Sequence, residues 1–414
     1  MLKNISRVRK KKKSKSPLLF LNLFISFLKN VFFNFLVFNF NIYIKQGIWI
    51  FIFLFLWKIL GGFWMKGKLI LENGMSFEGK IFGELGDSVG ELVFNTGMTG
   101  YQELLTDPSY YGQIVVMTYP MVGNYGINLE DMESDGIKLK GFIIKEDAKL
   151  PNNFRCEMTL DGFLRQHKVV GFKGVDTRHL TKIIREEGAM KALITAKELT
   201  QKEINEYFEN FSNTDAVERV STKEIYEIPG EGKRIGVVDF GVKKNILRSF
   251  QERGVHQIVF PWNVTAEELL SYNLDAVFLS NGPGDPAELT GVINEIKKLV
   301  GKLPIVGICL GHQLLAWALG GTTKKLKYGH RGCNHPVKDL EKNRIFITSQ
   351  NHGYVVDQVP ESMKVTHINL NDNSIEGMRS VEHRILCVQY HPEAWPGPSD
   401  SQYLFDDFLK VIEG

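Results

Sequence analysis

Acidic residues are missing from the beginning of this 414-residue chain, since residues 1–64 contain no Asp or Glu and no Ala or His. The remaining residues are mildly acidic, although the whole chain has a formal net charge of +3, so a nucleic-acid partner is not expected. Long apolar runs are missing too. The charge-free stretches 17–28, 30–44 and 46–57 are all shorter than the roughly 20 residues that span a bilayer.

Residues 1–64 have two interpretations. They are rich in Phe, Lys, Asn, Ile and Leu, which is the composition that AT-rich non-coding DNA gives when it is translated, and Gly61-Gly62 fits a ribosome-binding sequence just upstream of Met65. We therefore predict that the protein starts at Met65. The alternative is a membrane anchor or a targeting segment, because 8–15 is basic, but no small-residue cleavage site follows. Without this segment we expect a cytoplasmic protein that has no membrane partner.

Cysteine is scarce: Cys156, Cys309, Cys333 and Cys387 are the only four, and their spacing is not paired. This pattern is typical of a reducing compartment. The order Cys309, His312, Cys333, His335 matches no common zinc spacing, so no metal site is expected. The Gly-x-x-x-x-Gly-Lys-Ser/Thr phosphate loop is also absent, and for that reason we do not expect this chain to bind ATP.

The length predicts two or three domains. Short strands predicted at 68–71, 76–81, 91–95 and 113–118, with an amphipathic helix at 176–187, indicate a mixed β-rich α/β domain over 65–220. The polar, Gly-containing segment 221–233 predicts a linker. Strands at 234–240, 275–280 and 303–308 alternate with helices, so 234–414 is predicted to be an α/β domain with a mostly parallel sheet. Ligands of such sheets lie beyond the carboxyl ends of the strands.

Cys309 is the best candidate for a nucleophile. It stands between an apolar strand and a helix, with Gly307 and Gly311 two residues away on either side, as in the sharp turn that presents a nucleophilic Ser in hydrolases. The positive end of the helix favours the thiolate form, and adjacent backbone N–H groups are expected to bind an oxyanion. A lone cysteine is more often a small core residue, and the flanking glycines argue against that here.

His391 and Glu393 are candidates for a general base and its orienting carboxylate. A strand predicted at 384–390 ends at His391, and alternation in an extended chain would point both side chains to the same side. The alternative is an exposed turn without a function.

Several segments resemble one family closely. Four segments of this chain resemble the motifs of class I glutamine amidotransferases: GICLGHQ (307–313), NGPGDP (281–286), SQNHGY (349–354) and QYHPEAWPGP (389–398). Residues 94–128, 174–194 and 237–248 resemble the narrower family of carbamoyl-phosphate synthase small subunits. The resemblance extends from Met65 to the C-terminus and does not include residues 1–64.

This resemblance implies a Cys309–His391–Glu393 triad and a glutamine site between the two domains. One departure is Trp395, where the family more often has Ser, and this residue could alter the rim of the site. Tyr354 stands at a position where the family also has Phe. The implied glutamine contacts are Ser109, Gly282, Gly284, Leu310, Gln313, Asn351, Gly353 and Tyr354.

The resemblance further implies that the chain releases ammonia from glutamine for a separate large subunit. That partner would bind ATP, Mg²⁺ and bicarbonate and would make carbamoyl phosphate for arginine and pyrimidine biosynthesis, while this chain itself carries no cofactor. Three alternatives were weighed: another class I amidotransferase, a non-catalytic scaffold, and a relative of serine hydrolases or cysteine proteases. The first does not explain the segment 94–128, and the second would be expected to lack Cys309, which is present. The third does not fit the spacing of two residues between His391 and Glu393.

Overall fold

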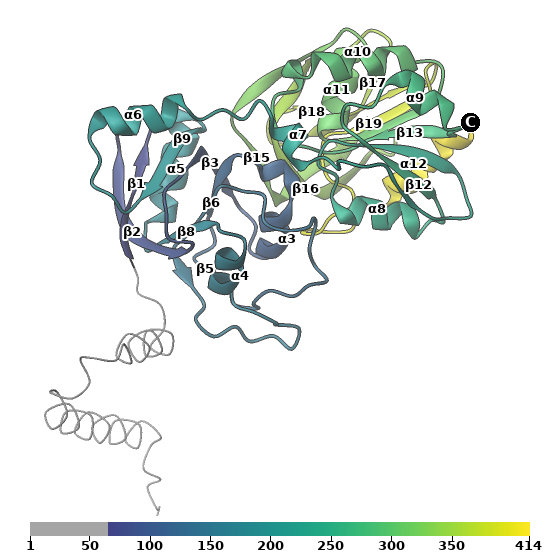
Figure 1. The fold of residues 1–414 in the computed structure, drawn as a ribbon. Helices are drawn as coiled ribbons and strands as arrows, with labels where there is room; N and C mark the ends of the chain where they lie inside the picture. The colour runs from purple at the N-terminus through teal and green to yellow at the C-terminus, as the bar shows by residue number, and fades with distance from the viewer. Residues whose placement is uncertain (1–64) are drawn as a thin grey trace, which may run out of the picture. The chain divides into compact units, whose positions relative to one another are not determined.

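Two large sheets organise the protein in the computed structural model, which describes residues 65–414 (Figure 1). The expectations on residues 1–64 lie outside the described residues. Both sheets belong to one compact unit. In the part of the chain that the structure describes, no helix combines the length and the apolar character needed to cross a membrane.

The N-terminal sheet closes into a barrel with the strand order β1-β2-β8-β6-β4-β3-β9. Each strand predicted in this half is present. The predicted helix is α5 (Thr177–Glu187), which begins at the cap Asp176 and ends at Gly188. Its apolar stripe packs on the barrel strands and joins their core. The barrel strands are β1 (Met65–Leu71), β2 (Ser76–Gly83), β3 (Ser88–Asn95), β4 (Gln113–Met117), β6 (Gly141–Ile144), β8 (Val170–Lys173) and β9 (Met190–Thr195).

Short elements complete this half. The two-residue strands β5 (Met121–Val122) and β7 (Glu146–Asp147) pair with each other. The helix α3 (Tyr101–Thr106) leads into the 3₁₀ turn η1 (Pro108–Tyr110), and Asp107 caps that turn by accepting a hydrogen bond from the N–H of Ser109. The other helices are α4 (Leu160–Gln166), α6 (Gln201–Glu209) and α7 (Ala216–Val220).

The C-terminal sheet has ten strands in the order β10-β12-β11-β13-β14-β19-β18-β17-β15-β16. Its parallel part confirms the predicted α/β class. The parallel strands are β12 (His256–Pro261), β11 (Arg234–Asp239), β13 (Ala276–Leu279), β14 (Ile305–Ile308) and β19 (Ile385–Val388). The antiparallel strands are β10 (Tyr226–Ile228), β18 (Ile375–Ser380), β17 (Lys364–Asn369), β15 (Thr322–Asp339) and β16 (Arg344–Gln358).

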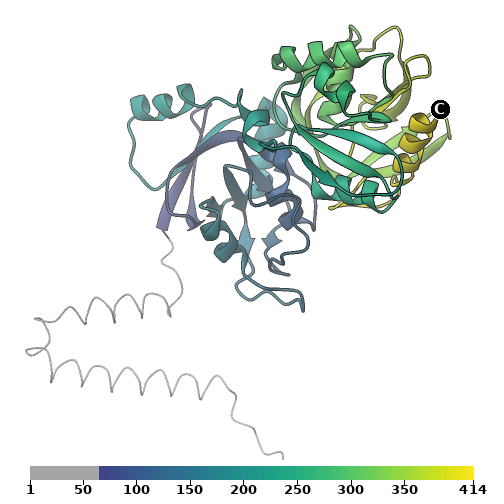
Figure 2. The same cartoon turned by 45° about the vertical axis from the view of Figure 1, so that its right-hand side comes forward.

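Helices cover both faces of the parallel strands (Figure 2). The helices α9 (Ala266–Ser271), α10 (Thr290–Leu299) and α11 (Leu310–Ala318) pack on one face, and α8 (Lys244–Gln251) and α12 (Tyr403–Glu413) pack on the other. In α10 the buried Val292, Ile293, Ile296 and Leu299 form one stripe, and full burial of such side chains contributes about 1.5–3 kcal/mol each.

The structure adds two features to the prediction for this half. Within the predicted linker, Tyr226–Ile228 forms the edge strand β10, which pairs with β12. The long hairpin of β15 and β16 extends the sheet on its antiparallel side and reaches the barrel, since the N–H of Thr96 donates to the carbonyl of Arg331. A second 3₁₀ turn, η2 (Pro286–Glu288), follows the turn after β13.

Candidate active site

Cys309 stands on a strained turn between β14 and α11. Its backbone has φ 53° and ψ −102°, a conformation that residues with a side chain rarely adopt and that often marks a functional position. The neighbouring glycine is required by space, because a Cβ on Gly311 would lie 2.2 Å from the carbonyl oxygen of Leu279. The predicted nucleophile turn is therefore confirmed as a backbone geometry.

The backbone N–H groups after Cys309 differ in their availability. The N–H of Gly311 donates to the carbonyl of Ser280 at 3.0 Å, so it does not serve an oxyanion, contrary to the expectation that the adjacent groups are all free. The N–H of Leu310 is the first of α11 and has no partner four residues earlier within the helix. It is the group next to the thiol that could bind an oxyanion.

His391 and Glu393 form a buried pair, with His391 Nδ1 at 2.6 Å from Glu393 Oε1. The predicted contact is confirmed, but its predicted cause was wrong. The strand β19 ends at Val388, and residues 391–394 form a turn in which the N–H of Ala394 donates to the carbonyl of His391. The turn, rather than the alternation of an extended strand, brings the two side chains together.

The protonation of this pair follows from its charges. Burial lowers the pKa of His391, but the carboxylate of Glu393 and the thiol group of Cys309 outweigh burial and raise that pKa to about 10. Nδ1 faces Glu393, and Nε2 has no hydrogen-bond partner among residues 65–414. Nε2 is thus the nitrogen that remains for proton transfer.

Lys243 is a third buried member of this cluster, and the sequence analysis missed it. Its Nζ lies 2.9 Å from Glu393 Oε1 and donates to the carbonyls of Ala394 and Trp395, also at 2.9 Å. Burial raises the pKa of Glu393, but Lys243 and His391 outweigh burial and lower it to about 2. The residue lies in the segment 237–248 that carried the resemblance, but nothing in its spacing indicated a role.

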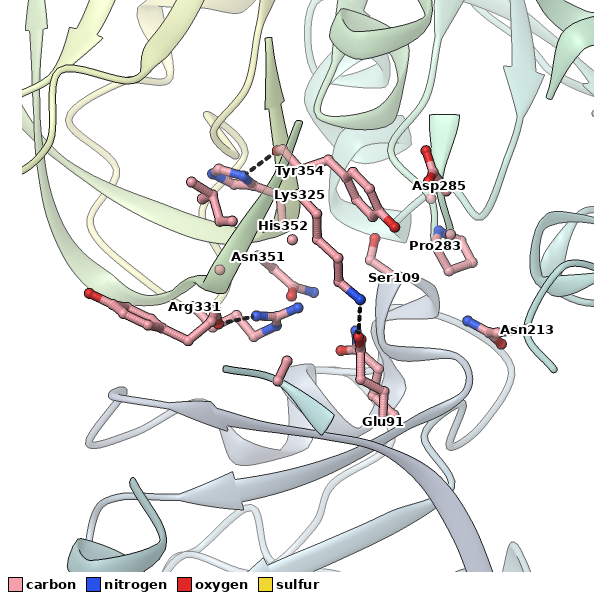
Figure 3. Close-up of a pocket in the computed structure, with 18 of the residues that line it drawn as sticks. Glu91, Ser109, Asn213, Pro283, Asp285, Lys325, Arg331, Asn351, His352 and Tyr354 are labelled. Carbon is pink, nitrogen blue, oxygen red and sulfur yellow. Dashed lines mark hydrogen bonds and ion pairs between the residues drawn. The ribbon is translucent and has the colours of Figure 1, made fainter. Parts of the chain in front are cut away.

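A cavity of about 340 Å³ opens next to Cys309 (Figure 3). Most of the expected glutamine contacts line this cavity. Leu310 is the exception, because its side chain is buried and does not line the cavity. The side chain of Trp395 does not line it either and is 41% exposed. The expected contacts that line the cavity are Ser109, Gly282, Gly284, Gln313, Asn351, Gly353 and Tyr354.

Both halves of the chain build this cavity. Asp107 accepts the N–H of Ser109 through Oδ1 and the side-chain amide of Asn351 through Oδ2, each at 2.9 Å. The hydroxyl of Ser109 accepts a hydrogen bond from Asn281 at 2.9 Å. These contacts join the turn after α3 to the ends of β13 and to β16, so the site lies between the two halves, as expected.

Charged residues also line the cavity. Lys325 on β15 forms an ion pair with Glu91 on β3 at 2.6 Å, and Figure 3 shows this contact between side chains from opposite halves. Burial raises the pKa of Glu91, but Lys325 and Arg331 outweigh it, so the pKa is below its ordinary value. Arg331 is buried nearby, with Nη1 donating to the carbonyl of Tyr328. None of these three residues was predicted from the sequence.

Two family models match separate parts of this chain. Residues 236–411 match the family model of class I glutamine amidotransferases, and residues 69–194 match that of the carbamoyl-phosphate synthase small chain, CPSase domain. The carbamoyl phosphate synthase small chain of Clostridium perfringens is 62% identical over 346 residues, which cover 84% of this chain and 99% of the relative. The pyrimidine-specific small chain of Bacillus subtilis is 50% identical over 354 residues, covering 84% and 96%.

Proposed function

This chain belongs to the family of carbamoyl-phosphate synthase small chains and is a glutamine amidotransferase subunit, and we propose that it releases ammonia from glutamine with Cys309, His391 and Glu393. The observation that carries the proposal is the position of Cys309. Cys309 lies on a strained turn at the wall of a cavity. The buried pair of His391 and Glu393 lies beside it, and Nε2 of His391 has no hydrogen-bond partner among residues 65–414.

The first half of the reaction forms a thioester. The thiolate of Cys309 attacks the carbon of the substrate's side-chain amide, and the carbonyl oxygen becomes an oxyanion. The N–H of Leu310 and the turn of Gly282–Gly284 are the proposed donors to this oxygen, and each such donor contributes roughly 3–4 kcal/mol in related sites. His391 then gives the proton on Nε2 to the departing nitrogen, the C–N bond breaks, and ammonia leaves.

The second half releases glutamate. Neutral His391 takes a proton from water through Nε2, the hydroxide attacks the thioester carbon, and the C–S bond breaks to restore the Cys309 thiolate. Glu393 keeps Nδ1 protonated throughout, so that the lone pair and the transferred proton stay on Nε2. Lys243 holds Glu393 in its ionised form by charge and by its hydrogen bond.

The proposed destination of the ammonia is a separate large chain. Both relatives are named small chains of carbamoyl phosphate synthase, and a small chain implies a large partner. We propose that this partner binds ATP, Mg²⁺ and bicarbonate, that this chain needs no cofactor of its own, and that the enzyme works in the cytoplasm. The product would serve arginine and pyrimidine biosynthesis.

The test is the release of glutamate and ammonia from glutamine, measured for the full chain alone and with its co-expressed large chain. Cys309→Ser should lower turnover on the order of 10⁴–10⁶-fold, as the loss of a nucleophile does in other triads. Cys156→Ser is the matched control, because Cys156 is a free thiol that does not line the cavity and should leave turnover unchanged. Turnover that persists in Cys309→Ser, or that is absent in the complete pair of chains, would overturn the proposal.

A further inference from the structure

A cluster of His330, His352 and Glu376 adjoins the cavity, which His352 lines, and has no part in the proposed reaction. One atom that can bind a metal from each side chain lies within 4.8 Å of the others, and all three residues are buried. Among the His, Cys, Asp and Glu side chains of the described residues, this is the one group whose members are close enough to share an ion. The three come from β15, β16 and β18, which are separate strands of one sheet.

The outer nitrogen of each histidine is held by an acceptor. His330 Nε2 lies 2.8 Å from Asp372 Oδ2, and His352 Nδ1 lies 2.8 Å from the carbonyl oxygen of Tyr354 (Figure 3). Histidines that bind metals donate their second N–H to a carboxylate or a backbone carbonyl in this way, which fixes the tautomer and the ring orientation. Here the arrangement leaves His330 Nδ1 and His352 Nε2 as the inner nitrogens.

The inner nitrogen of His330 lacks a partner. Its Nδ1 makes no hydrogen bond within residues 65–414, the residue is 7% exposed, and Oε1 of Glu376 lies 3.8 Å from this nitrogen. That carboxylate is itself held in place, because Asn369 donates to Oε1 at 2.9 Å and Gln350 donates to Oε2 at 3.0 Å. A metal ligand held by hydrogen bonds of its own fits the same pattern.

The inner nitrogen of His352 lies against an oxygen. Nε2 is 2.7 Å from Oε1 of Gln350, an atom that only accepts, so both ring nitrogens would need protons in a fully buried ring. Turning the Gln350 amide would instead place its oxygen against Glu376. The first arrangement requires a doubly protonated buried ring, and the second sets two acceptors against each other, so hydrogen bonds alone do not satisfy this cluster.

We propose that His330 Nδ1, His352 Nε2 and Glu376 bind a divalent transition-metal ion, with Zn²⁺ as the best match to two imidazoles and one carboxylate. Two positive charges balance Glu376 and Asp372. Tetrahedral bonds of about 2.1 Å place two ligand atoms about 3.4 Å apart, so a pair at the 4.8 Å limit would have to close by about 1.4 Å through side-chain rotation. The ring of His335, whose Nδ1 also lacks a partner, lies 5.1 Å from that of His330 and is a candidate for the fourth ligand.

The consequence would be a metal that shapes the cavity rather than one that reacts. His352 stands between Asn351 and Gly353 on β16, and both neighbours line the cavity. An ion that ties His352 to β15 and β18 would hold this wall in place for the substrate. The metal site itself stands independently of the proposed function, because its occupancy is measured without turnover.

The experiment measures Zn²⁺ binding to the full chain carrying Cys309→Ser, which removes the catalytic thiol as a competing ligand. We expect one equivalent of Zn²⁺ to remain after desalting, as measured by mass spectrometry of the metal. Glu376→Gln should abolish this binding. Asp372→Asn should weaken it about 10–100-fold, which is the usual effect of losing an outer partner of a metal-bound histidine. His256→Gln, which changes a histidine paired with Glu227 outside the cluster, should retain the full equivalent.

Co²⁺ provides a second readout, because its absorption spectrum reports the ligands. Tetrahedral bands without a sulfur-to-cobalt transition, lost in Glu376→Gln, would support the site. The proposal is overturned if the parent chain retains no Zn²⁺, if Glu376→Gln retains as much as the parent, or if the Co²⁺ spectrum shows thiolate ligation. The first of these outcomes is measured without a substitution in the cluster. It therefore contradicts the proposal even if Glu376→Gln misfolds. In the chain with Cys309 intact, chelation should raise KM for glutamine more than it lowers kcat.

Discussion

The two walls of the cavity differ in what they contribute. On the C-terminal side, Cys309 lines the cavity, and His391 and Glu393 follow the neighbouring strand of the same sheet without lining the cavity themselves. On the N-terminal side, Ser109 lines the cavity and Asp107 holds it on a short turn, and these make hydrogen bonds but transfer no proton in the proposed mechanism. Chemistry is therefore concentrated in one half, whereas the shape of the cavity depends on both. Changes to the proposed triad should lower kcat, and changes to Asp107 or Ser109 should raise KM.

Among changes that leave Cys309 in place, Glu393→Gln should have the largest effect on rate and should change its pH dependence. Loss of the carboxylate should lower kcat about 10²–10⁴-fold, because Gln does not hold the reactive tautomer of His391. The pKa of His391, about 10 beside Glu393, should fall toward its ordinary value, so the alkaline limb of kcat/KM should move to lower pH. Steady-state kinetics from pH 6 to 10 measure both changes.

The same shift has a consequence for stability. The pKa of His391 is raised in the folded chain, so its stabilising contribution is complete below the unfolded pKa of about 6.5 and is lost as the pH rises through about 10. In Glu393→Gln this loss should begin at lower pH. Glu413→Gln, an exposed change at the C-terminus, is the control. An unchanged alkaline limb in Glu393→Gln would contradict the role given to this carboxylate.

Lys243→Met should have the largest effect on stability. It removes the buried cation that faces Glu393 and leaves the carboxylate and two carbonyls without their donor, which typically costs about 3–5 kcal/mol. Urea unfolding at neutral pH measures the change. The neighbouring Lys244 donates to the carbonyl of Ser134 near the surface, and Lys244→Met should stay within about 0.5 kcal/mol of the parent. Equal losses in the two variants would show that the buried pair has no special weight.

Asp107→Asn tests the other wall. An Asn side chain can accept only one of the two hydrogen bonds that Asp107 accepts from Ser109 and Asn351, and a bond to a charged group contributes about 1.5–3 kcal/mol. We expect KM for glutamine to rise about 10–100-fold while kcat changes less than about 3-fold. Asp161→Asn is the control, because Asp161 also accepts a backbone N–H but lies in the barrel away from the cavity. A loss confined to kcat would contradict the division between the walls.

The sequence predicted most of what depends on neighbouring residues. The turn at Cys309 and the helix α5 each have a local signature of glycines or periodicity, and the structure has them close to the predicted bounds. The class α/β is likewise confirmed, because apolar strands alternate with helices along the chain. Of the site, the contact between His391 and Glu393 was predicted, although a turn produces it.

The remaining features depend on pairings between distant segments. Lys243 and Glu393 are 150 residues apart, and nothing near either one indicates that they meet. The edge strand β10 lies in a polar segment that resembles a linker, and only its pairing with β12 makes it a strand. The antiparallel strands β15 to β18 alternate less regularly, with bulges between Lys325 and His330 and between Gly332 and His335. Because of these bulges, the sequence pattern did not indicate the long hairpin or the cluster of His330, His352 and Glu376.

Lys325→Gln should have the smallest effect, because the ion pair with Glu91 joins the two walls at a solvent-exposed position. The side chain of Lys325 is 50% exposed, and pairs of this kind contribute about 0.2–1 kcal/mol. The free energy of unfolding should change by less than about 1 kcal/mol, and KM for glutamine should rise no more than about 5-fold. Glu91 keeps a favourable interaction with Arg331, which limits the loss further.

Lys324→Gln separates a role in the cavity from a general effect of charge. Lys324 is the neighbouring residue on β15, carries the same charge and forms an ion pair with Asp357 at 2.8 Å, but it does not line the cavity. If the pair of Lys325 and Glu91 helps to close the cavity, KM should rise in Lys325→Gln and stay unchanged in Lys324→Gln, and the difference should shrink at high salt because exposed charges are screened. Equal values of KM for the two variants would show that the ion pair of Lys325 and Glu91 has no part in closing the cavity.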